Sequence, residues 1–189
     1  AGIIHVLNGK EIVYDRKWGM PADDFRVIHK DKQGNFWFAS RSGGLVKFKD
    51  GKILQRFGIG TGLESNYVLS IAESDDGKIY VGTHSGGLNV IDPNGKINTY
   101  HLKSDDAGVL LFNIDIDKQN RVWVTANIGP LYIGGDSLLP IKLKPDQRSK
   151  TYFDWVDDQH GHCLITTNVI ILQILKTDIV AFVEDNLHE

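Results

Sequence analysis

The sequence lacks most of the features that would tie a chain to a membrane, a nucleic acid or a disulfide framework. Its one cysteine, Cys163, cannot form an internal disulfide, which leaves both a reducing compartment and the periplasm open. No signal peptide is recognisable, and the longest apolar runs, Val109–Phe112 and Val169–Leu172, are far shorter than the ~20 residues that span a bilayer. The net charge is −3 and the lysines and arginines are scattered, which argues against a nucleic-acid partner.

Glycine and aromatic residues are plentiful. The 189 residues include 20 glycines, and 10% are aromatic. Hydrophobic residues make up 41% and charged residues 24%, which is the balance of a globular chain and excludes broad disorder. This composition favours many short strands joined by tight turns.

A long internal repeat decides the fold class. Residues 33–45 recur at 76–88 and again at 119–131, each time 43 residues further along, and a more worn copy starts at residue 160. Residues 2–9 resemble the second half of a copy, at 44–51. A repeat of this length with several strands per unit is typical of β-propeller blades. A β-solenoid is the structural alternative, but its units are usually shorter.

Each copy reads as four short alternating runs, called strands A to D. In the first full copy we expect them at Phe25–His29, Asn35–Ser40, Leu45–Lys49 and Ile53–Phe57. A D-x-x-G turn joins strands A and B, at 31–34, 74–77, 117–120 and 158–161, and predicts a closing residue in the left-handed region. Turns at 49–52 and 93–96 join strands C and D, and the last D strand is expected at Ile179–Val183.

The sequence therefore predicts an all-β fold: a β-propeller fragment of about four four-stranded antiparallel blades plus half a blade. The expected units are residues 1–21 (strands C and D of a preceding blade with a linker), 22–65, 66–108, 109–150 and 151–189, the last with a C-terminal tail. Apolar residues of strand B are expected to form the core between blades, namely Trp37, Tyr80, Trp123 and Leu164. Because the chain opens in mid-strand, we expect it to be a piece of a larger ring.

The repeat resembles one family. Its D-x-x-G turn, aromatic strand B ending in Ser or Thr, Gly-Gly-Leu and aspartate-rich hairpin are similar to the regulator propeller repeats of periplasmic sensor domains in hybrid two-component histidine kinases. The link at 61–68 matches the family pattern G-L-x-x-N-x-V, and 19–25 is a looser version. The resemblance covers residues 1–135 well. It implies the periplasmic part of an inner-membrane protein that responds to a ligand, often an oligosaccharide.

Candidate ligand-binding residues follow from propeller geometry. The B–C loops and D–A links share one face, where ligands commonly bind, and aromatic rings with planar hydrogen-bonding groups suit sugars. Ordinary exposed loop residues are the alternative for any single position. The candidates are Arg41, His84, Asn127 and Asn168 on the B–C loops, with Trp18, Asn66, Tyr67, Arg148 and Tyr152 on the links.

Other sites have weaker support. A column of strand A, read as Val27, Ser70, Asn113 and Asp154, is expected to face the central channel. Residues 115–120 resemble the start of a calcium loop but lack the later glutamate, so a turn is the better interpretation. The histidines at 160–162 have too few neighbouring ligands for a metal site. We expect no metal, no cofactor and no catalytic residue, because no nucleophile has a recognisable base partner.

Three functions remain open from the sequence. The leading one is a ligand-sensing module, with an oligosaccharide or other small ligand and the remaining blades of the parent protein as partners. The alternatives are a propeller enzyme of the streptogramin-lyase type and a protein-interaction scaffold. Since an open arc leaves its terminal blades uncovered, we also expect the fragment to self-associate or to distort at its ends.

Overall fold

The computed structural model describes residues 2–104, 107–141, 152–157, 162–167 and 171–175. Strands and turns make up almost all of this part of the chain, with one 3₁₀ turn, η1, at Ile59–Thr61. The strands are β1 (Ile3–Leu7), β2 (Lys10–Tyr14), β3 (Phe25–Lys30), β4 (Phe36–Ser40), β5 (Leu45–Lys49), β6 (Lys52–Phe57), β7 (Val68–Glu73), β8 (Ile79–Thr83), β9 (Leu88–Ile91), β10 (Ile97–Leu102), β11 (Leu111–Ile116), β12 (Val122–Ala126), β13 (Gly129–Gly134), β14 (Ser137–Pro140), β15 (Tyr152–Asp157), β16 (His162–Thr167) and β17 (Ile171–Leu175).

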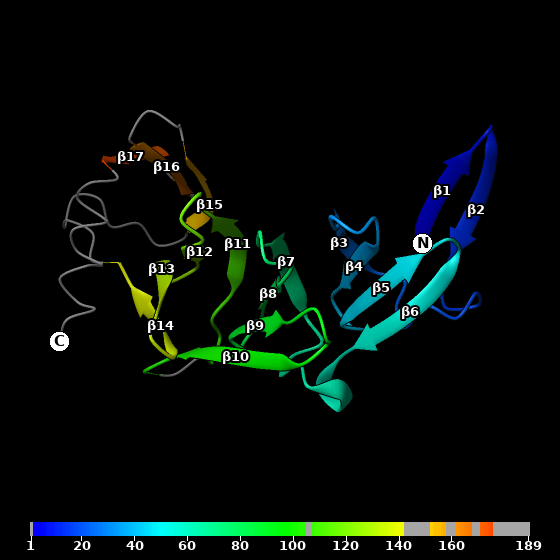
Figure 1. Ribbon diagram of the computed structural model, residues 1–189, viewed down its shortest axis with the longest axis horizontal. Helices are drawn as coiled ribbons and strands as arrows, with labels where there is room; N and C mark the ends of the chain where they lie inside the picture. Colours follow the sequence, from blue (N-terminus) through cyan, green and yellow to red (C-terminus); the bar gives the residue numbers. More distant parts are fainter. Residues whose placement is uncertain (1, 105–106, 142–151, 158–161, 168–170, 176–189) are drawn as a thin grey trace.

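The sheets follow one another in chain order as propeller blades. Strands β1–β2 form an N-terminal pair, β3–β6 a first blade, β7–β10 a second and β11–β14 a third, and β15–β17 form a fourth sheet. Successive strands within each sheet are antiparallel. Figure 1 shows them as an open row, with β1–β2 and β15–β17 at opposite ends. The predicted fold class is confirmed.

The hairpin turns explain why the N-terminal pair is half a blade. Asn8 and Gly9 have φ angles of 50° and 74°, and Asp50 and Gly51 in the first blade have 49° and 74°. Two successive residues with positive φ are the requirement of a tight two-residue hairpin that matches strand twist. The pair β1–β2 therefore repeats the hairpin β5–β6 in its backbone as well as its sequence.

The A–B turns at 31–34, 74–77 and 117–120 close as predicted, and the expected turn at 158–161 lies outside the described residues. Gly34, Gly77 and Asn120 lie in the left-handed region at φ 79°, 78° and 59°. In each turn the backbone N–H of that residue donates to the carbonyl of the residue three positions earlier, Asp31, Ser74 or Asp117, at 2.9–3.1 Å. Asparagine tolerates this conformation better than other non-glycine residues, which accounts for Asn120 in the third copy.

The cores lie between blades. Trp37 of β4 is buried in a cluster with Ile79 and Ile91 of the second blade, and its ring stacks on Phe57 at 5.6 Å between centroids. Tyr80 of β8 is buried in the next cluster, which continues into the third blade. The predicted role of strand B is therefore confirmed for these two aromatics. Trp123 is also buried, and Leu164 lies in β16, where its side chain is not among those described.

The expected channel-facing column points elsewhere. Val27 packs against the core between the first and second blades, and Ser70 is buried with its hydroxyl donating to the Leu111 carbonyl at 2.9 Å. The Asn113 amide likewise donates to Asp154 of β15. A β-bulge interrupts each A strand just before these positions and changes the direction of the side chains that follow. The column therefore joins neighbouring blades.

The observed strands differ from the expected ones only at their ends. Strand β3 continues to Lys30, β4 starts at Phe36 and β6 starts at Lys52. The outer strands β10 and β14 pair in parallel over two residues, which merges the second and third blades into one eight-stranded sheet. The expected strand at residues 179–183 lies outside the described residues. Within the described part of the chain, no helix is long and apolar enough to cross a membrane.

Candidate functional site

The candidate site lies at the end of the blades that carries the B–C loops, here called the B–C-loop face. The same backbone bond recurs there in three blades, because the first residue of each B–C loop donates its N–H to the D–A link. These bonds run from Arg41 to Asp24 (3.3 Å), from His84 to Tyr67 (3.0 Å) and from Asn127 to Leu110 (3.2 Å). The first two loops are also tied to the link that follows them, through bonds from the Gly44 N–H to the Asn66 carbonyl and from the Ser85 N–H to the Val109 carbonyl. The backbone at the start of the B–C loops is therefore held in the same way in all three blades, while the side chains there differ.

At the junction of the first and second blades, three side chains converge on the ring of a fourth, Tyr67. The Tyr67 hydroxyl accepts hydrogen bonds from Arg26 Nη1 at 2.9 Å and Arg41 Nε at 3.0 Å. The two guanidinium carbons lie 5.9 and 5.5 Å from the ring centroid. His84 stacks on the same ring, with 5.5 Å between centroids and 12° between planes. This group, the Tyr67 cluster, joins strand β3, two B–C loops and one D–A link.

The cluster is positively charged and accessible. Arg26 and Arg41 are exposed, whereas Tyr67 and His84 are half-buried. Among the described residues, neither guanidinium has a carboxylate within 4.0 Å. Asp24, whose carbonyl accepts from the Arg41 N–H, has its carboxylate bonded to the Ser42 hydroxyl at 2.9 Å.

Three of the predicted site residues therefore come together: Arg41, Tyr67 and His84. Two others hold the backbone instead. The Asn66 side chain accepts from the Ile59 N–H at 2.9 Å. The Asn127 side chain accepts from the Leu110 N–H at 2.9 Å and donates to the Gly108 carbonyl at 3.0 Å.

The remaining predicted residues are not part of the cluster as described. Trp18 packs edge-on against Tyr14 at 4.8 Å and lies 5.9 Å from Phe48, while 40% of its surface stays exposed. Arg148 and Asn168 lie outside the described residues. Tyr152 begins β15, and its side chain is not described.

Arg26 is the cluster member that the sequence argument missed. It occupies the bulge of strand β3, where the second and third blades carry Leu69 and Phe112. One arginine among apolar residues at a repeated position is a usable signal, because the repeat itself does not explain it. Reading strand A only for its apolar residues hid this difference.

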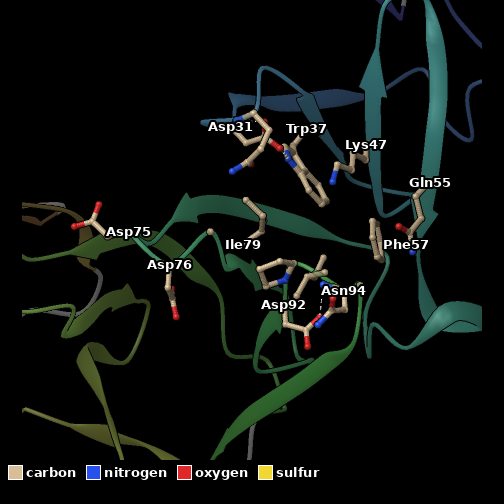
Figure 2. Close-up of a pocket in the computed structure, with 15 residues that line it drawn as sticks. Asp31, Trp37, Lys47, Gln55, Phe57, Asp75, Asp76, Ile79, Asp92 and Asn94 are labelled. Atoms are coloured by element: carbon tan, nitrogen blue, oxygen red, sulfur yellow. Dashed lines mark hydrogen bonds between the residues drawn. The ribbon is translucent and has the colours of Figure 1, made fainter.

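The opposite end of the same junction, the A–B-turn face, holds a cleft of about 490 Å³. Trp37 and Lys47 of the first blade and Ile79, Asp92 and Asn94 of the second face this cleft (Figure 2). The Lys47 ammonium lies 5.1 Å from the Trp37 ring. The sequence did not point to this cleft, because its residues come from turns and core strand positions that the repeat already explains.

Asp31 organises the turn beside the cleft. Its carboxylate is buried and accepts from the N–H groups of Gln33 and Asn35, the Asn35 amide and the Trp37 indole, at 2.7–3.1 Å. Burial raises the pKa of the Asp31 carboxyl, but the hydrogen bonds from Asn35 and Trp37 outweigh it, so this pKa lies below its ordinary value. The recurring aspartate is thus a structural acceptor.

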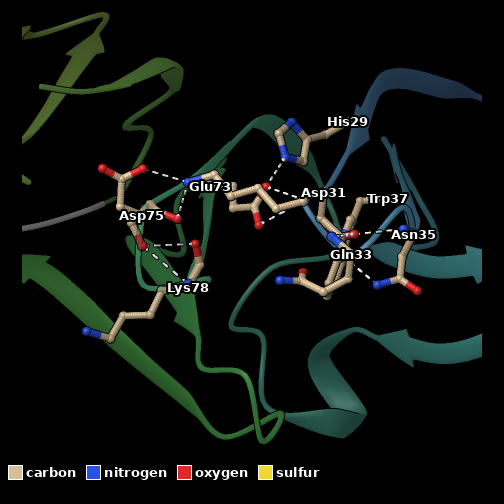
Figure 3. A network of polar contacts seen from close by, with 10 residues as sticks. His29, Asp31, Gln33, Asn35, Trp37, Glu73, Asp75 and Lys78 are labelled. Carbon is tan, nitrogen blue, oxygen red and sulfur yellow. Dashed lines mark hydrogen bonds and ion pairs between the residues drawn. The ribbon is translucent and has the colours of Figure 1, made fainter. Parts of the chain in front are cut away.

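A polar seam next to Asp31 links the first and second blades (Figure 3). The Lys32 backbone donates to Glu73, and its ammonium pairs with Asp75 at 2.6 Å. His29 Nε2 is buried 3.5 Å from the Glu73 carboxylate. These contacts hold the end of β3, the innermost strand of the first blade, against the end of β7, the innermost strand of the second.

The region that resembles a calcium loop is a turn. Asp117 accepts from the N–H groups of Gln119 and Arg121, from the Arg121 guanidinium and from the Trp123 indole. Its oxygens are directed at the protein itself. Within the described residues, no three His, Cys, Asp or Glu side chains are grouped as a metal site would require.

Residues 62–85 match the family described as the two component regulator propeller. The matched segment runs from the link before β7 to the B–C loop after β8, and it includes Tyr67 and His84. This segment is therefore similar to a two-component regulator propeller repeat. The resemblance stated from the sequence is confirmed at this repeat. No curated protein matches the sequence.

Solved structures share the fold. One is the extracellular domain of a protein described as a hybrid two-component system from B. thetaiotaomicron, with a TM-score of 0.68 and 17% identity over 87% of this chain and 23% of that one. A second such domain from the same organism gives 0.62 and 16% over 94% and 30%. The chain spans less than a third of either protein.

Virginiamycin B lyase from Staphylococcus aureus has a similar fold as well. Its TM-score is 0.63 and its identity 19%, over 89% of this chain and 60% of the lyase. At these identities the similarities establish the propeller fold and leave the activity to the site.

Proposed function

We propose that the chain is a ligand-sensing part of the periplasmic propeller domain of a two-component signalling protein in the inner membrane, and that its ligand is an oligosaccharide or another small polar molecule. The observation that carries the proposal is the Tyr67 cluster. Two B–C loops, one link and strand β3 contribute side chains to one exposed point, and two of these side chains lie in the regulator propeller repeat. Aromatic rings beside planar donors are suited to sugars.

The position of the cluster between two blades suggests how binding becomes a signal. Arg41 belongs to the first blade, whereas Tyr67 and His84 belong to the second. A ligand held by all three favours one angle between the blades. Because a ligand shifts an equilibrium only by its differential affinity for two states, this bridging contact supplies the required difference.

Thermal unfolding in the presence of an oligosaccharide panel tests the proposal. A ligand raises the melting temperature without being consumed, and Tyr67→Ala abolishes the increase. Trp18→Ala is the matched control, because it removes an aromatic side chain from another link and keeps the increase. Loss of the ligand from solution, measured by chromatography, would instead favour a lyase-type enzyme, for which the similarity to virginiamycin B lyase is the supporting observation. Absence of any stabilising sugar, with a partner chain bound instead, would favour a scaffold.

A further inference from the structure

We propose that Arg26 and Arg41 bind an oxyanion, the carboxylate or sulfate group of a ligand. This inference rests on the proposed function, since it names the chemical class that the Tyr67 cluster recognises. Its basis is an excess of hydrogen-bond donors over acceptors at that cluster.

The two arginines share one neutral acceptor. Each donates one N–H to the Tyr67 hydroxyl oxygen. A guanidinium has five N–H donors, and a phenol oxygen has two lone pairs, which these two bonds occupy. Both arginine side chains are exposed, and among the described residues their guanidiniums make no other hydrogen bond.

The nearby carboxylates are engaged elsewhere. Asp23 pairs with Arg16 at 3.5 Å, and Glu64 contacts His101 at 3.1 Å. Asp24 accepts from Ser42. The three acids closest to the cluster in sequence thus leave both guanidiniums uncompensated, in contrast to Arg121, whose guanidinium is 2.7 Å from Asp117.

Two cations that converge on one atom repel each other, and an anion between them relieves the repulsion. Hydrogen bonds from guanidinium to carboxylate, sulfate or phosphate are short and charge-assisted, and the planar arginine fork suits these groups. Tyr67 and His84 stack on each other beside the arginines, so the proposed oxyanion site lies next to an aromatic pair.

The anion site is specific to this junction. At the next junction, between the second and third blades, the positions of Arg26, Arg41 and Tyr67 are occupied by Leu69, His84 and Leu110. The backbone bond from His84 to Tyr67 recurs at the next junction as the bond from Asn127 to Leu110, so the charge difference comes from the side chains at these matched positions.

Three sugars that differ only at one carbon provide the test: galactose, galacturonate and galactose 6-sulfate. Binding to the 189-residue chain is measured by calorimetry. We expect at least one charged sugar to bind about tenfold more tightly than galactose. The charged sugar that binds more tightly shows whether the site prefers a carboxylate or a sulfate group. Added NaCl should weaken the binding, because both partners are exposed.

The double variant Arg26→Ala/Arg41→Ala should lose this preference. Lys52→Ala, which removes one positive charge from an exposed position of the β5–β6 hairpin, should keep it. Melting curves check that each variant is folded.

Equal binding of all three sugars, or an unchanged preference in the double variant, would overturn the anion site. So would the absence of charged-sugar binding up to about 100 mM. If galactose binds equally well and Tyr67→Ala abolishes that binding, the sensor proposal survives without the anion. If the charged sugars bind as expected but are consumed, the oxyanion site stands and the sensor proposal fails.

Discussion

At the two ends of the junction between the first and second blades, polar side chains have opposite roles. At the A–B-turn face, Asp31 directs its carboxylate into four donors of its own turn and strand. At the B–C-loop face, Arg26 and Arg41 share a single phenol acceptor. A polar group that is satisfied within the protein stabilises the fold, and one whose partners are missing is available to a ligand. Changes at the first end should therefore reduce stability, and changes at the second should reduce binding.

Replacement of Trp37 by alanine should have the largest effect on stability. The indole is buried between two blades and stacks on Phe57, so its removal should lower the free energy of unfolding by roughly 3–5 kcal/mol. Chemical denaturation followed by circular dichroism measures this loss. Trp18→Ala is the control, since that indole is 40% exposed and should cost much less. Equal losses for the two would contradict the inter-blade core.

Asp31→Asn should have the next largest effect, about 2 kcal/mol, because it removes the charge from a buried acceptor of several hydrogen bonds. The folded-state pKa of Asp31 lies below its ordinary value of 3.8, so the ionised carboxylate stabilises the fold at neutral pH. That stabilisation is lost as the pH falls below about 4, through the folded-state pKa. Denaturation at several pH values should show a shallower acid decline in Asp31→Asn than in the unmodified chain. An identical decline would exclude Asp31 as a source of the acid sensitivity.

Tyr67→Phe should show most clearly that the B–C-loop face contributes to binding and not to stability. It keeps the ring that stacks on His84 and removes the acceptor that holds both arginines. We expect a stability change within about 0.5 kcal/mol, because the ring and its contacts are kept, together with weaker ligand binding. Calorimetry and melting curves on the same sample measure both quantities. A loss of stability as large as that of Asp31→Asn would show that the cluster is structural.

The smallest predicted effect is a weak self-association of the chain through the N-terminal pair β1–β2. Strands β1 and β2 expose Ile4 (60%), Val6 (61%) and Leu7 (55%), and in the described part of the chain β1 pairs with β2 alone. An open edge beside apolar side chains favours association, so we propose that the fragment self-associates weakly. Sedimentation across a range of concentrations should show this, and Val6→Lys should reduce it. A monomer at every concentration, with undistorted ends, would contradict the proposal.

The same contrast explains what the sequence could predict. A turn such as 31–34 recurs because its backbone conformation favours Asp or Ser at one end and Gly or Asn at the other, so the repeat predicts both the blades and the buried role of Trp37. The Tyr67 cluster consists of residues that differ from one copy of the repeat to the next. Arg41 and His84 were found because they occupy equivalent positions in the B–C loops. Arg26 was missed because it replaces an apolar residue inside a strand. The side chains of Val27 and Ser70 point toward the next blade and not into the channel. This was missed because a β-bulge cannot be recognised in the pattern of apolar residues.

The central claim is that, of the two junctions between the first three blades, the first carries the binding site and the second does not. Titration of the ¹⁵N-labelled chain with sodium sulfate, followed by amide chemical shifts, tests it directly. The account predicts saturable shifts at Arg26, Arg41, Tyr67 and His84 and none at Leu110 or Asn127, at constant ionic strength. Shifts of equal size at both junctions, or none at the first, would contradict it.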